Sequence, residues 1–79
     1  MQVIVDISLY PMANDYDGHI LTLIQNLQSV NGIEVTPGET STVVRGEYDV
    51  VFEVLEREIK AILSSKVRSA LVIKLLNTA

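Results

Sequence analysis

The spacing of hydrophobic residues along this chain changes twice, from every second position to every third or fourth position. Residues 3–10 alternate in the two-residue period of a strand with one apolar face, which comprises Val3, Val5, Ile7 and Leu9. Pro11 ends this strand. Apolar residues then recur at the i, i+3, i+4, i+7 spacing of an amphipathic helix that ends near Asn31-Gly32, namely Ile20, Leu23, Ile24 and Leu27. The first part of the chain therefore predicts a strand followed by a helix.

The same alternation of periods returns after residue 32. Residues 33–36 and 40–45 are rich in β-branched side chains and are separated by the turn Pro37-Gly38, which predicts a hairpin. From about Asp49 the helical spacing reappears, with one apolar side formed by Val51, Phe52, Leu55, Ile59, Ile62 and Leu63. Residues 69–76 form a last apolar strand that is interrupted by Lys74. The expected order of elements is β-α-β-β-α-β.

This order restricts the possible topologies. Right-handed crossovers place the first and third strands in the middle of a four-stranded antiparallel sheet of order 4-1-3-2, with both helices on one face. We therefore expect an α+β, ferredoxin-like βαββαβ sandwich, and the length of 79 residues predicts a single domain over residues 1–79.

The face of the sheet without helices is expected to carry a set of polar side chains. The predicted set consists of Asp6, Ser8 and Tyr10 from the first strand, Thr40 and Thr42 from the third, and Lys74 from the last. Apolar Ile4, Val44, Val72 and Leu76 are expected beside them. Two interpretations fit this pattern: a solvated face with an Asp6–Lys74 ion pair, or a ligand site within an oligomer.

Composition excludes several classes of partner. Ten acidic and six basic residues give a net charge of −4, which disfavours nucleic acid and favours a cationic small molecule. No apolar run reaches the roughly 20 residues of a membrane span, and no secretion signal is apparent. The absence of cysteine excludes disulfides and thiolate zinc sites. We expect a soluble cytoplasmic protein with no membrane partner.

Catalytic and metal-binding arrangements are not indicated. His19 has no second histidine or cysteine to share a metal or activate a nucleophile, so a surface or packing role is favoured. Residues 11–15 lack the arginine and glycine-rich run of an acylphosphatase-like phosphate cradle and the Cys-x-x-Cys of a metal chaperone. Tyr10 alone could stack on RNA bases from the open face. The sequence predicts a protein that is not an enzyme and holds no cofactor or metal.

Three segments carry a family resemblance. They are residues 9–16 after the first strand, residues 40–49 where the hairpin meets the second helix, and Val72-Ile73-Lys74 in the last strand. Together they resemble the YkoF-like family of thiamine-binding proteins. The resemblance implies a subunit that assembles into homodimers or homotetramers and binds thiamine or its hydroxymethylpyrimidine moiety without chemical turnover. By position it places a family acid and hydroxyl on Asp6 and Ser8, a second hydroxyl on Thr42 and a lysine on Lys74. The alternative is an oligomeric structural or interaction module with no small-molecule ligand.

Overall fold

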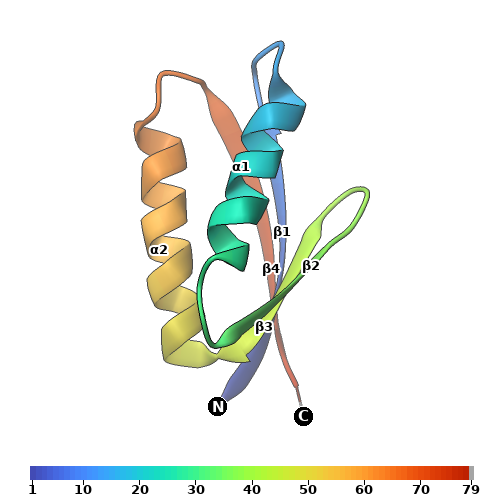
Figure 1. Ribbon diagram of the computed structural model, residues 1–79, viewed down its shortest axis with the longest axis vertical. Helices are drawn as coiled ribbons and strands as arrows, with labels where there is room; N and C mark the ends of the chain where they lie inside the picture. The colour runs from blue at the N-terminus through green and yellow to red at the C-terminus, as the bar shows by residue number, and fades with distance from the viewer. Residues whose placement is uncertain (79) are drawn as a thin grey trace.

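The computed structural model describes residues 1–78, which form a four-stranded antiparallel sheet with two helices on one face (Figure 1). The elements are β1 (Gln2–Pro11), α1 (Tyr16–Gln28), β2 (Ile33–Pro37), β3 (Thr42–Glu47), α2 (Tyr48–Ser64) and β4 (Ser69–Asn77). The strand order β2-β3-β1-β4 is the expected 4-1-3-2 order. The prediction of an α+β ferredoxin-like fold is confirmed.

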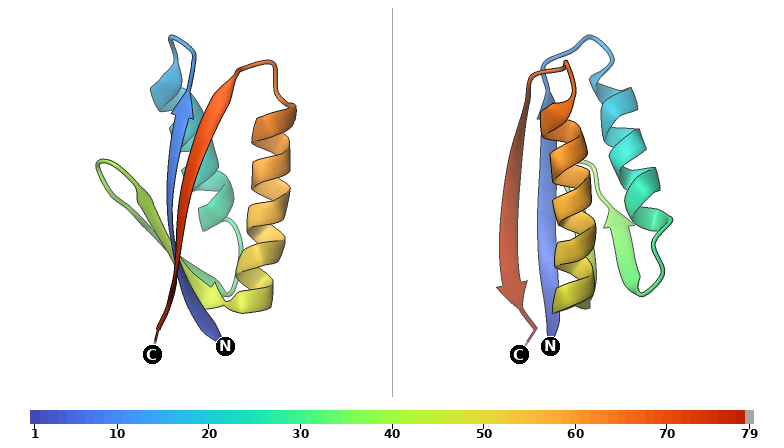
Figure 2. Two further views of the ribbon diagram at one scale, coloured as in Figure 1. Left: turned by 180° about the vertical axis from the view of Figure 1, so that it is seen from behind. Right: turned by 90° about the vertical axis from the view of Figure 1, so that its left-hand side faces the viewer.

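Strand β1 is one of the two inner strands of the sheet, next to β3. It pairs antiparallel with β3 on one side and with β4 on the other, so that Asp6 lies opposite Val43 and opposite Lys74. Strands β2 and β4 are the two edges. Figure 2 shows that both helices lie on the same side of the sheet, which leaves the other side uncovered.

The core lies between β1 and the two helices. The alternate residues Val3, Val5, Ile7 and Leu9 of β1 are all buried. They belong to one cluster with Leu23 and Leu27 of α1, Val44 of β3, and Val51, Val54 and Leu55 of α2. Full burial of a side chain of this size contributes roughly 1.5–3 kcal/mol, so this cluster is the main source of stability. It also fixes which residues of β1 face away from the helices.

Gly46 allows β3 to pass directly into α2. Strand β3 ends at Glu47 and α2 begins at Tyr48, with no loop between them. A Cβ atom on Gly46 would lie 3.0 Å from Cγ2 of Ile33 and 3.1 Å from Cγ2 of Val51. A larger residue at this position would therefore require Ile33 and Val51 to shift.

The boundaries and faces of some elements differ from expectation. Helix α1 ends at Gln28, before the turn that contains Gly32, whose φ is +91°. Phe52 and Leu63 were expected on the buried side of α2 but are 37% and 63% exposed. Val54 and Glu58 occupy buried positions instead, because residues 51, 54, 55 and 58 form the helical stripe that meets β1 and α1.

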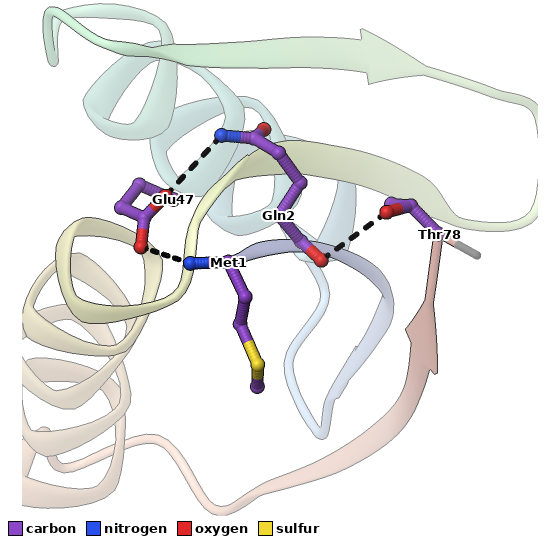
Figure 3. A network of polar contacts seen from close by, with 4 residues as sticks. All are labelled: Met1, Gln2, Glu47 and Thr78. Carbon is purple, nitrogen blue, oxygen red and sulfur yellow. Dashed lines mark hydrogen bonds and ion pairs between the residues drawn. The ribbon is translucent and has the colours of Figure 1, made fainter.

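The two ends of the described chain are held together by exposed polar contacts (Figure 3). The Met1 ammonium pairs with Glu47, and Nε2 of Gln2 donates to Oε2 of Glu47 at 3.4 Å. The hydroxyl of Thr78 donates to the backbone oxygen of Gln2 at 3.5 Å. Each such exposed contact contributes about 1 kcal/mol or less. No helix within residues 1–78 has the length and hydropathy needed to cross a membrane.

Candidate ligand-binding site

A pocket of about 240 Å³ opens on the sheet face that carries no helix. Its lining comes from β1, β4 and the loop between β2 and β3, and consists of Asp6, Ser8, Tyr10, Thr40, Ser41, Val72 and Lys74. Five of the six residues predicted from the sequence therefore lie together. We call this the open-face pocket.

Asp6 is the distinctive group in the open-face pocket. Its Oδ1 atom is buried and has no hydrogen-bond partner within the described chain. A buried polar atom without a partner costs roughly 1–3 kcal/mol, and native structures contain few of them. Asp6 therefore brings to the pocket lining a carboxylate with one oxygen that has no partner among residues 1–78.

Lys74 lies beside Asp6 without pairing with it. The two residues are direct Cα partners across β1 and β4. The salt bridges among residues 1–78 are nevertheless those of Met1 with Glu47 and of Arg57 with Glu58. The Asp6–Lys74 ion pair of the solvated-face interpretation is therefore not formed. The pocket has a carboxylate acceptor and a separate ammonium donor on neighbouring strands.

The rest of the lining supplies hydroxyl groups and a flat apolar surface. The Ser8 hydroxyl donates to the backbone oxygen of Thr40 at 3.3 Å, which ties β1 to the loop before β3. Thr40 and Ser41 add two more hydroxyls from that loop. Tyr10 and Val72 are 55% and 48% exposed, so each offers apolar area to a bound ring.

The expected position of Thr42 on the open face is wrong. Thr42 is only 5% exposed and lies opposite Ile7, which belongs to the core. It lines a cavity of about 50 Å³ on the helix side, under the β2–β3 loop. Val44 is also in the core, and Val43 faces outward instead, because side chains on a strand alternate between faces. Thr40 reaches the open-face pocket because it precedes β3 and lies in the loop.

A second polar cluster, which the sequence pattern did not indicate, lies between the helices. Glu58 is 6% exposed and accepts from Nδ2 of Asn26 at 2.9 Å and from Nε of Arg57 at 3.2 Å. His19 lines the same cavity of about 190 Å³. No group of three or more metal-ligating side chains occurs among residues 1–78. Both carboxylate oxygens of Glu58 have partners, and the bond from Asn26 links α2 to α1.

Sequence similarity identifies the family. The model of the YkoF-related family matches residues 2–74, which is nearly the whole chain. The chain belongs to the YkoF-related family. Among curated proteins, none is significantly similar to this family member in sequence.

Several solved structures share the fold of this YkoF-related chain. A candidate thiamine biosynthesis or salvage protein of Thermotoga maritima matches with a TM-score of 0.80 and 22% identity, over 99% of this chain and 85% of that chain. A domain of unknown function from Bacillus cereus matches with a TM-score of 0.74 and 25% identity, over 98% of this chain and 76% of that chain. A protein of Streptococcus pneumoniae has a TM-score of 0.74 and 18% identity, with coverages of 99% and 90%.

Proposed function

We propose that this protein binds thiamine or its hydroxymethylpyrimidine moiety in the open-face pocket and does not transform it. The observation that carries the proposal is Asp6, a residue of the pocket lining whose carboxylate has one buried oxygen, Oδ1, without a hydrogen-bond partner. Membership of the YkoF-related family and the description of the Thermotoga maritima neighbour support a thiamine-related ligand.

The lining is chemically complementary to an aminopyrimidine. An exocyclic amino group needs an acceptor, which Asp6 provides, while ring nitrogens need donors such as the ammonium of Lys74 or the hydroxyls of Thr40 and Ser41. A flat ring can lie against Tyr10. A hydrogen bond to the charged carboxylate is worth about 1.5–3 kcal/mol, more than any neutral bond in the pocket. The amino group and Asp6 are therefore the pair that would fix the ligand's orientation.

The size and charge of the pocket restrict the choice among thiamine derivatives. A volume of about 240 Å³ is below the roughly 300–1,000 Å³ of sites for drug-sized ligands, so one ring fits inside. The positive thiazolium would then lie near the mouth, where the net charge of −4 attracts it. Lys74 is the one basic residue in the lining, too few for a diphosphate. Free thiamine and the pyrimidine alcohol are the preferred ligands.

Isothermal titration of the protein and of Asp6→Asn with thiamine and with hydroxymethylpyrimidine tests this assignment. We expect both ligands to bind the parent protein, and Asp6→Asn to weaken both by about 10- to 100-fold through loss of the charge-assisted bond. Glu34→Gln is the matched control, since it removes one negative charge from the same sheet face outside the pocket lining. It should leave both affinities within about twofold.

Unchanged binding in Asp6→Asn would refute the role of Asp6, and absence of binding by the folded parent protein would refute the proposed function. Circular dichroism of each variant verifies that the fold is retained. In the second case the alternative of an assembly or interaction module without a small-molecule ligand would stand.

A further inference from the structure

The connection from α1 to β2 contains an asparagine followed by a glycine. Asn31 and Gly32 lie in the turn between these two elements, and both residues are exposed. Figure 1 shows this turn at the same end of the molecule as the N-terminus. Gly32 has a φ of +91°, which favours glycine, and a Cβ atom on it would meet nothing within 4 Å. The peptide bond that joins the two residues therefore lies in open surroundings.

The hydrogen bonds near this turn do not restrain the two residues. At the end of α1 they are donated by the backbone N–H groups of Ser29 and Val30 and by the Ser29 hydroxyl. The pairing of β2 with β3 begins at Ile33. Within residues 1–78, neither the side chain of Asn31 nor the N–H group of Gly32 forms a hydrogen bond. The side-chain amide of Asn31 is therefore free to rotate toward a backbone nitrogen that has no bond to break.

We propose that Asn31 is a site of spontaneous deamidation, in which water is the co-reactant and ammonia is released. The backbone nitrogen of Gly32 gives up its proton and attacks Cγ of the Asn31 side chain. A C–N bond forms, the bond from Cγ to Nδ2 breaks, and the proton leaves with the amide nitrogen as ammonia. Water then adds its hydroxyl to one of the two carbonyls of the cyclic succinimide and returns a proton to nitrogen, which gives aspartate or isoaspartate.

The three other asparagines of the chain lack this combination of features. Asn14 is exposed in the turn before α1, but the next residue is an aspartate, whose Cβ hinders the same attack. Asn26 lies within α1 and donates to a buried carboxylate, and Asn77 belongs to β4. Asn14 is thus the natural comparison for Asn31, because both lie in exposed turns. Neither Asn31 nor Gly32 lines the open-face pocket, so the proposal does not depend on ligand binding.

Isoaspartate at position 31 would strain the start of β2. Its main chain runs through the former side chain, so one extra methylene enters the backbone directly before Gly32. The Gly32 oxygen lies 3.2 Å from the position of a Cβ atom on Gly46, so the two strands approach closely at this point. Ile33 pairs with Gly46 and packs against the core, while β2 is an edge with β3 as its neighbour. The modification would therefore loosen the pairing of β2 with β3 from this end.

Incubation of the full chain in mildly acidic and mildly alkaline buffers tests the site. We expect a mass change equal to replacement of an amino group by a hydroxyl group, and peptide mapping should locate it at Asn31. The change should be faster in the alkaline buffer, because the attacking nitrogen must lose its proton. Its rate at Asn31 should exceed the rate at Asn14 by about tenfold or more.

Two glutamine variants serve as a matched pair. Asn31→Gln should lose the fast modification, because the longer side chain must close a larger ring. Asn14→Gln also replaces an asparagine of an exposed turn, and it should keep the fast modification. Equal rates at Asn31 and Asn14, or fast modification that persists in Asn31→Gln, would overturn the proposal.

Urea denaturation tests the effect on β2. Anion exchange separates the modified protein by its added negative charge, and a protein-isoaspartate methyltransferase measures its isoaspartate content. We expect the urea midpoint of the isoaspartate form to fall by roughly 0.5 M or more. Asn31→Asp is the control, since it has the added charge without the extra methylene, and its midpoint should stay within roughly 0.2 M of the parental value. An isoaspartate form with the midpoint of Asn31→Asp would refute the loosening of β2.

Discussion

Ser8 and Thr42 both carry hydroxyls and lie close in space, but on opposite faces of the sheet. Ser8 lines the open-face pocket and Thr42 is buried on the helix side. We expect Ser8→Ala to weaken ligand binding by about 0.5–1.5 kcal/mol. The substitution removes a hydroxyl from the pocket lining and the hydrogen bond to the backbone oxygen of Thr40. Thr42→Val should leave affinity within about twofold, since no Thr42 atom reaches that lining. Calorimetry on both variants measures the difference. Equal losses would mean that the ligand reaches the cavity under the loop.

The sequence alone does not predict which residues of β3 face the helices. The two faces of β1 could be predicted because Asp6, Ser8 and Tyr10 alternate regularly with apolar residues. In β3 the adjacent valines 43 and 44 are equally suited to either face, so local pattern could not decide between two registers that differ by one residue. Pairing of Val44 with Val5 settles it, and that contact is long-range. The pocket was predicted almost completely because most of its residues lie on β1 and β4.

At the scale of elements, the two helices are joined by the Asn26–Glu58 hydrogen bond. Removing its donor in Asn26→Ala would leave Oε1 of the buried Glu58 carboxylate without this partner, and we expect the free energy of unfolding to fall by about 1.5–3 kcal/mol. Gln25→Ala is the control, as Gln25 is exposed on the same helix, and it should change stability by less than about 0.5 kcal/mol. Urea denaturation measures both. A loss no larger than that of the control would show that the bond contributes little.

The orientation of α2 was harder to predict than its existence. Apolar residues occur on more than one side of this helix, so hydrophobic spacing alone placed Phe52 and Leu63 in the core. Glutamate is rarely buried, yet Glu58 is buried, because Asn26 of α1 provides the donor that makes burial tolerable. The hydrogen-bond donor lies 32 positions away along the chain, so the local sequence pattern around Glu58 does not predict its burial.

At the scale of the whole molecule, the net charge of −4 acts on cationic and neutral ligands differently. Raising salt from roughly 0.1 M to roughly 1 M shortens the Debye length from about 10 Å to about 3 Å, which screens the attraction of the protein for the thiazolium. We expect thiamine to bind about threefold or more weakly at the higher salt. Neutral hydroxymethylpyrimidine should change by less than about twofold. Titrations of both ligands at the two salt concentrations measure this difference. Equal salt dependence of the two affinities would show that the negative charge of the protein does not attract the thiazolium.

The open-face pocket is lined partly by strands and partly by a loop. Asp6, Val72 and Lys74 stand on strands that are paired along their length, whereas Thr40 and Ser41 belong to a four-residue loop that Gly38 closes by donating to the backbone oxygen of Ser41 at 2.8 Å. Loops open at a smaller cost in free energy than paired strands, and they move within nanoseconds to microseconds. Equilibrium affinity would then be set mainly by the strand side of the pocket, and the rates at which a ligand enters and leaves would be set by the loop.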